Sequence, residues 1–210
     1  MAEVGEERAT GLSDSRSAAF AGMVAPVFFV TVFTVEGWLR PGYDQASMFV
    51  SELSIGPHGW VQVANCVITG VLLLYFTRGV AIHLNWNKTA RVGITLLRII
   101  GWSLVLSGLF VTDPSALFNQ VSVHGILHGL FGVLVFSLAP VSCFVYSACF
   151  RPDPVWWPLA PVTLSAGIII AVWIVFQYRT TYVQAAPRAG KGCLESPKYV
   201  SVSVSSHRIA

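Results

Sequence analysis

Long apolar runs alternate with short polar segments along the whole chain. A helix needs about 20 mostly apolar residues to cross about 30 Å of hydrocarbon, and five runs reach that length. Runs such as VLLLYF and AGIIIAVWIVF lack the alternation of barrel strands, so helices are predicted. We therefore predict an all-α fold, a polytopic transmembrane helix bundle with five spans at residues 17–39, 59–77, 90–111, 123–150 and 156–178.

The composition agrees with a chain that lives in a lipid bilayer. Of its 210 residues, 54% are hydrophobic and only 11% are charged, whereas soluble domains have about 25% charged residues. The net charge of +3 comes from cations scattered between the apolar runs, so no nucleic-acid partner is expected. The four cysteines lie far apart without a Cys-x-x-Cys pair, which indicates neither a disulfide framework nor a cysteine metal site.

The pattern divides the chain into three parts. Residues 1–16 form a polar N-terminus, residues 17–178 a five-helix transmembrane domain, and residues 179–210 a polar tail that we expect to be disordered. Short loops rich in Lys and Arg stay in the cytoplasm. That rule predicts a multi-pass protein of the cell membrane with a cytoplasmic N-terminus, although the tail, predicted to lie outside, also carries cations.

With that orientation, the polar candidates gather on the outer face. The catalytic candidates are Ser51, Glu52 and Asp113, and the metal-ligand candidates are His124, His128 and Asp113. His124 and His128 are four apart, so their Cβ atoms lie about 6 Å apart on one helix face. Such a pair suits zinc, with a carboxylate as third ligand. It also suits hydrogen bonds that fix the packing of a neighbouring span, which is the commoner role of such a pair.

Glycines recur on the same predicted helix. Gly125, Gly129 and Gly132 would leave one stripe without side chains, which is typical of a close helix-helix contact. The stripe predicts packing against another helix, and a homo-oligomer built from helix contacts is one such arrangement.

Several strings resemble a known family. They are RPGYD, VSELSIGPHGWVQVANCVITGVLLLYF, TDP and HGILHGLFGVLVFSLAPVSCFV. Over about residues 18–178 the chain resembles the integral-membrane family called domain of unknown function family 998. The resemblance implies a multi-helix membrane protein with no established activity. Members usually look like six-span proteins, and here a polar tail stands in place of the sixth span.

A second, weaker likeness concerns residue types alone. His pairs, Asp and Ser also occur around zinc in the membrane hydrolase superfamily of alkaline ceramidases and adiponectin receptors, although in another order. That likeness implies an intramembrane metal-dependent hydrolase acting on lipid-like amides or esters.

Three functions therefore compete. The first is binding of a lipid head group, small molecule or partner at the polar outer face without chemistry. The second is the zinc hydrolase, and the third is a small-solute transporter, for which five spans give no clean two-fold repeat. We expect Ser51 and Glu52, Asp113, and the two histidines to converge, because spans joined by short loops tend to be neighbours.

Overall fold

The computed structural model describes residues 2–45, 48–83, 87–114 and 122–179. The chain divides into two compact units, residues 1–171 and 172–210. Among the described residues, the second unit contains only the last part of one helix and Arg179. The predicted disordered tail lies, after Arg179, outside the described residues.

The prediction of an all-α membrane fold is confirmed. The helices are α1 (Ala2–Leu39), the short 3-10 helix η1 (Val50–Ser54), α2 (Trp60–His83), α3 (Lys88–Leu109), α4 (Val123–Phe150) and α5 (Leu159–Tyr178). Five of them are long and apolar enough to cross a membrane, and no strand occurs in the described ranges. The fourth span has the predicted bounds.

The first helix is longer than its apolar run. It begins at Ala2, so the polar N-terminal segment continues the helix instead of preceding it. Its 38 residues correspond to about 57 Å at 1.5 Å per residue, against a hydrocarbon thickness of about 30 Å. A polar segment ends a membrane span but can continue the helix. The apolar run therefore predicted a shorter helix than α1.

Polar side chains cap the middle helices. The side chain of Asn87 accepts a hydrogen bond from Ala90 N at 2.7 Å at the start of α3, and Ser122 does the same for Gly125 N at 3.0 Å at the start of α4. Each cap satisfies one of the backbone N–H groups that a helix start leaves without a partner.

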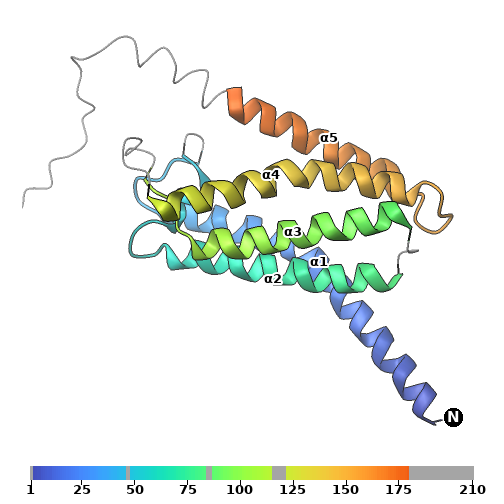
Figure 1. Cartoon of the computed structure of the whole chain (residues 1–210). Coiled ribbons are helices and arrows are strands. Elements are labelled where there is room, and N and C mark those ends of the chain that lie inside the picture. The colour runs from blue at the N-terminus through green and yellow to red at the C-terminus, as the bar shows by residue number, and fades with distance from the viewer. Residues whose placement is uncertain (1, 46–47, 84–86, 115–121, 180–210) are drawn as a thin grey trace, which may run out of the picture. The chain divides into compact units, whose positions relative to one another are not determined.

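Consecutive helices pack on one another. Within the first unit α1 packs on α2, α2 on α3 and α3 on α4, and Figure 1 shows α2, α3 and α4 running side by side. Two backbones approach closely at Gly70 of α2, where an added Cβ would lie 2.7 Å from Gly101 O of α3. On α5, the Ala160 carbonyl accepts a hydrogen bond from Ser147 Oγ of α4 at 2.8 Å.

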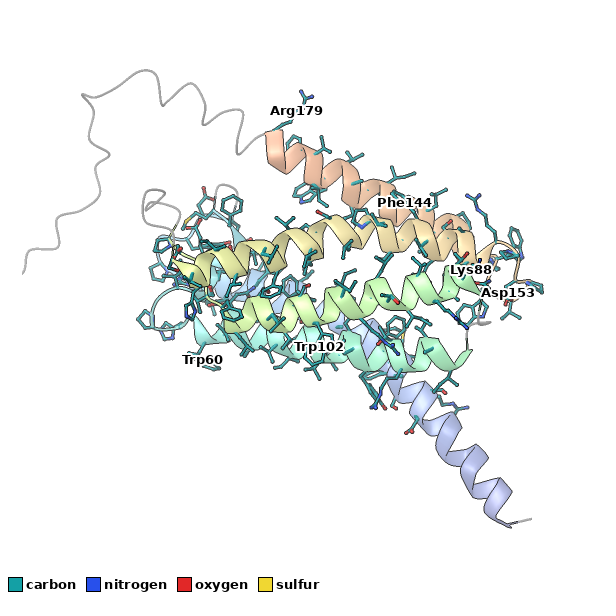
Figure 2. The ribbon with its side chains drawn as sticks, in the orientation of Figure 1. Trp60, Lys88, Trp102, Phe144, Asp153 and Arg179 are labelled. Carbon is teal, nitrogen blue, oxygen red and sulfur yellow. The ribbon has the colours of Figure 1, made fainter. Side chains whose placement is uncertain are left out.

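The two ends of the four packed helices carry different connections. Trp60 marks one end and Lys88 the other (Figure 2). At the end marked by Trp60, called the Trp60 end below, α1 is joined to α2 and α3 to α4. These two connections hold the polar candidates. Gly108, near the end of α3, would place a Cβ 3.0 Å from Val63 O of α2, so the two connections belong to the same end of the bundle.

Within the first unit the predicted glycine stripe does not pack against another helix, and its use in a contact between copies of the chain stays a prediction. A Cβ on Gly129 or Gly132 would meet no described atom within 4 Å, so neither glycine lies against another helix of the first unit. Gly125 is crowded, but by the Asp113 carboxylate instead of a helix. The spacing of the glycines could not distinguish a helix–helix contact from the single close contact between Gly125 and Asp113.

Candidate functional site

The α3–α4 connection is closed by Asp113. Its Oδ2 accepts a hydrogen bond from Ser122 N, and its Oδ1 accepts one from Ser122 Oγ, both at 2.7 Å. Ser122 is the N-cap of α4 and also accepts from Gly125 N. A carboxylate at this place interacts favourably with the positive end of the helix dipole. Asp113 therefore ties the beginning of α4 to the segment that follows α3.

Gly125 makes room for this carboxylate. A Cβ at Gly125 would lie 2.0 Å from Asp113 Oδ2 and 2.6 Å from its Cγ, far inside van der Waals contact. A side chain at position 125 would force Asp113 away from Ser122. The Thr-Asp-Pro segment and Gly125, the third residue of α4, thus form one structural unit.

The electrostatics of Asp113 follow from these bonds. The Ser122 hydroxyl, and next the Ser122 backbone N–H, lower the pKa of the Asp113 carboxyl, and the nearby His124 adds to the effect. The carboxylate is therefore ionised at neutral pH. His124 itself is exposed, and its ring meets Phe110 edge-on with centroids 5.5 Å apart.

His128 bonds to the end of α3. Its Nδ1 lies 2.9 Å from Ser107 O and 2.8 Å from Phe110 O. Carbonyl oxygens only accept hydrogen bonds, so Nδ1 must carry the proton. The last carbonyls of a helix lack partners within it, and His128 supplies one from α4. The spacing of the two histidines suited either a metal site or helix packing, and these bonds give His128 a role in helix packing.

The serine of this connection is not set up as a nucleophile. Ser122, Asp113 and His124 have the residue types of a hydrolase triad, but the Ser122 hydroxyl donates to Asp113 and accepts from Gly125 N. In a Ser-His-Asp triad the serine instead donates to the histidine. The bonds of Ser122 are those of a helix cap.

The α1–α2 connection is fastened by Arg40. Its guanidinium donates to Leu53 O at 2.5 Å and also to Ile55 O, so it holds both sides of the end of η1. Leu53 is fully buried. Gln45 Nε2 donates to Thr34 O at 2.9 Å and covers the last turns of α1.

Ser51 and Glu52 lie in η1 of this connection. Glu52 Oε1 accepts from Phe49 N at 3.4 Å, and Ser51 O accepts from Ser54 Oγ at 2.6 Å. Burial, and then the carboxylates of Glu52 and Glu36, raise the pKa of the nearby Tyr43 phenol. Tyr43 therefore keeps its proton as a hydrogen-bond donor.

An open hollow of about 390 Å³ lies against this connection. Its lining consists of Gly37, Trp38, Arg40, Tyr43, Asp44 and Gln45. It combines a cation, an anion, an amide and two aromatic side chains at the end of a membrane span.

The structure does not assemble a zinc site. Among the residues that it describes, no three His, Cys, Asp or Glu side chains are grouped so as to hold a metal ion. The metal candidates His124, His128 and Asp113 belong to the α3–α4 connection and its helix, whereas Ser51 and Glu52 belong to η1. Zinc is thus without support from the geometry, and a catalytic role for Ser51, Glu52 or Asp113 stays a prediction.

Sequence reasoning overlooked a set of buried polar residues in α1 and α2. Glu36 lies in the last turn of α1, and its side chain is 9% exposed. Gln62, Asn65 and Thr69 lie within the second apolar run and are 2%, 1% and 6% exposed. Their spacing of three and four residues was a usable signal, because it places all three on one helix face.

The family comparison agrees with this architecture. The profile of the family described as "Protein of unknown function (DUF998)" matches residues 23–195. This chain belongs to that family of membrane proteins, and the match extends past residue 178, where the resemblance was expected to end. Neither the curated proteins nor the solved structures contain a match to this chain.

Proposed function

We propose that this multi-pass membrane protein binds a polar head group or small polar molecule, without chemistry, in the hollow of the α1–α2 connection. The observation that carries the proposal is the hollow itself, lined by Arg40, Tyr43 and Gln45 on a connection that is already fastened to α1. A preformed site binds without the cost of ordering its loops.

The side chains around the hollow suit a lipid head group. Trp38 is 77% exposed at the end of α1, and exposed tryptophans favour the membrane–water interface. A guanidinium carries five N–H groups, so Arg40 can hold two carbonyls and still donate to a phosphate or carboxylate. Tyr43 and Gln45 add neutral hydrogen-bonding groups of both kinds.

The test compares two tryptophans of the same end. The full chain is purified in mild detergent, and the lipid that remains bound is measured by native mass spectrometry. We expect Trp38→Leu to lower retained lipid several-fold. The matched variant Trp60→Leu, also exposed but outside the lining of the hollow, should retain as much lipid as the parent protein. Equal retention by all three proteins would contradict the proposal.

Soluble head groups separate lipid binding from solute binding. Glycerophosphate and ethanolamine phosphate are added to delipidated protein, and the unfolding midpoint is recorded. A rise in the parent and in Trp60→Leu, but not in Trp38→Leu, would assign the hollow to the polar group alone. A rise with vesicles only would assign it to the intact lipid.

We also propose that the N-terminus is cytoplasmic and that the Trp60 end faces outward. The distribution of Lys and Arg supports this orientation. A membrane-impermeant thiol reagent, applied to intact cells that express a cysteine-free parent with one added cysteine, should label Gln45→Cys and not Lys88→Cys. The opposite labelling would reverse the orientation.

A further inference from the structure

An arginine faces outward in the middle of α3. Arg98 is the eleventh of the 22 residues of this helix, and its side chain is exposed. At 1.5 Å per residue it lies about 15 Å from the start of α3 at Lys88, which is half of a hydrocarbon thickness of about 30 Å. Charged side chains within membrane spans almost always face the interior of the bundle or a water-filled cavity. Arg98 instead faces away from the other helices, so its charge calls for a partner beside the protein.

The chain places no carboxylate near Arg98. In the described residues Arg98 has neither an ion pair nor a hydrogen bond. The helices α2, α3, α4 and α5 contain no Asp or Glu at all. On α1, Glu36 is buried at the Trp60 end beside Arg40. Asp14 is separated from the depth of Arg98 by more than the turn that ends at Ala18, which packs at the opposite end of the bundle. The anion that neutralises Arg98 must therefore come from outside these spans.

A second arginine lies on the same side of the α2–α3 pair. These antiparallel helices approach closely at Gly70 and Gly101. Arg78 follows Gly70 by 78 − 70 = 8 residues, which is a rotation of about 80° around α2. Arg98 precedes Gly101 by 101 − 98 = 3 residues, which is a rotation of about 60° in the same sense around α3. In an antiparallel pair, equal senses of rotation point to the same side, and Arg78 is exposed as well.

We call this side of α2 and α3 the basic face. Arg98 lies about 4.5 Å and Arg78 about 12 Å from the level of the two glycines, both toward the end marked by Lys88. Trp102 is four residues from Arg98, on the same side of α3, and is 57% exposed, and Val71 of α2 is 52% exposed. Tryptophan favours the boundary between head groups and hydrocarbon. The basic face thus offers two cations, an indole and apolar surface, which match the parts of a phospholipid.

We propose that the basic face binds an anionic phospholipid, with the phosphate held by Arg98 and Arg78 and the acyl chains lying along Trp102 and Val71. A guanidinium binds phosphate through two parallel hydrogen bonds, and basic residues close to the membrane surface attract anionic lipids. The basic face shares no residue with the hollow of the α1–α2 connection. The proposal therefore does not depend on head-group binding in that hollow.

A second copy of the chain suits the basic face less well. Its α2 to α5 would bring no carboxylate. In a two-fold contact through this face the same patch meets itself, so Arg98 would lie near another Arg98. A phospholipid supplies the missing anion, and its acyl chains keep the surrounding apolar surface covered.

The test is native mass spectrometry of the full chain in detergent micelles. Phosphatidylglycerol and phosphatidylcholine with the same acyl chains are titrated separately. Every protein carries Trp38→Leu, so that lipid held in the hollow does not contribute. We expect phosphatidylglycerol to bind more tightly than phosphatidylcholine. Arg98→Leu should weaken phosphatidylglycerol binding about fivefold, which is the usual contribution of one basic residue near a membrane surface, and should leave phosphatidylcholine binding within about twofold.

Arg151→Leu is the matched control. Arg151 is exposed at the end of α4, outside the basic face, and its replacement removes the same charge. This variant should bind phosphatidylglycerol as tightly as the protein that keeps both arginines. Leucine is well tolerated within a membrane span, so Arg98→Leu should fold. Equal phosphatidylglycerol affinities for the two variants, or equal affinities for the two lipids before either change, would overturn the proposal.

The same spectra test the second copy as the occupant. A dimer that disappears in Arg98→Leu while phosphatidylglycerol binding stays unchanged would assign the basic face to a second copy and overturn the lipid site.

The unfolding midpoint in nanodiscs is an independent measurement. Replacing phosphatidylcholine by phosphatidylglycerol should raise the midpoint of Arg151→Leu more than that of Arg98→Leu, because a ligand stabilises the folded protein that binds it. Equal rises would also overturn the site.

Discussion

The two connections at the Trp60 end place their polar groups in opposite situations. In the α3–α4 connection, Asp113, Ser122 and His128 all engage backbone or side-chain partners. In the α1–α2 connection, Arg40 donates to two carbonyls, while both oxygens of Glu36 lack a hydrogen bond. Polar groups with partners hold the helices in place, whereas the Glu36 carboxylate contributes no hydrogen bond to the packing in the described residues.

This difference changes which polar residues are the stronger candidates for a functional site. The histidine pair and the Thr-Asp-Pro segment attract attention because their residue types occur in catalytic sites. Their hydrogen bonds have the geometry of a helix cap and of a tie between α3 and α4. Glu36 and Asn65 have ordinary sequence surroundings, yet they hold the unused acceptors.

The largest expected effect is at Arg40. Arg40→Leu removes both bonds to the connection and leaves the buried carboxylate of Glu36 without its counter-ion. Loss of one member of a buried pair costs about 3–5 kcal/mol, and since Arg40 is partly exposed we expect about 3 kcal/mol. Chemical unfolding in mixed micelles measures the change. The exposed Arg151 is the control, and Arg151→Leu should cost less than about 0.5 kcal/mol.

A smaller effect is expected at the glycine beneath Asp113. Gly125→Ala places a methyl group 2.0 Å from Asp113 Oδ2, and overpacking of this kind costs about 1–3 kcal/mol. Gly129→Ala, on the same helix with open space around its Cβ, should be neutral or stabilising by up to about 1 kcal/mol. Equal unfolding free energies for the two variants would show that Asp113 does not depend on the glycine.

The cap of α4 should contribute less. Ser122→Ala removes an N-cap, which costs about 1 kcal/mol, and removes the hydroxyl hydrogen bond to Asp113 while the backbone N–H of residue 122 still donates to that carboxylate. Because the bonds from Ser122 lower the pKa of Asp113 in the folded protein, their stabilisation is complete above the ordinary carboxyl pKa of about 3.9. It is lost as the pH falls through the lowered value. Across acid pH, the gap between the unfolding midpoints of Ser122→Ala and the parent should narrow to the part that the N-cap contributes, and a constant gap would contradict the assignment.

The fold was predictable because lipid leaves few alternatives. Apolar runs gave five spans, and Val123–Phe150 was correct at both ends. The start of α1 was missed because a polar segment can continue a helix in water. Hydrogen-bond partners were not predictable, since they depend on which carbonyl faces His128 and which oxygen faces Asn65. Burial of Glu36 was likewise not predictable, since it depends on the segments that pack against α1.

The most direct test compares Asp113→Asn with Glu36→Gln. Each change replaces a carboxylate by an amide of the same shape, and the free energy of unfolding is measured for both variants at neutral pH. Asp113 accepts two hydrogen bonds from Ser122 and Glu36 Oε1 and Oε2 accept none. We therefore predict that Asp113→Asn lowers the unfolding free energy, whereas Glu36→Gln leaves it unchanged or raises it. A loss for Glu36→Gln that equals or exceeds the loss for Asp113→Asn would contradict the account, because Glu36 would then stabilise the fold as much as a carboxylate with hydrogen bonds.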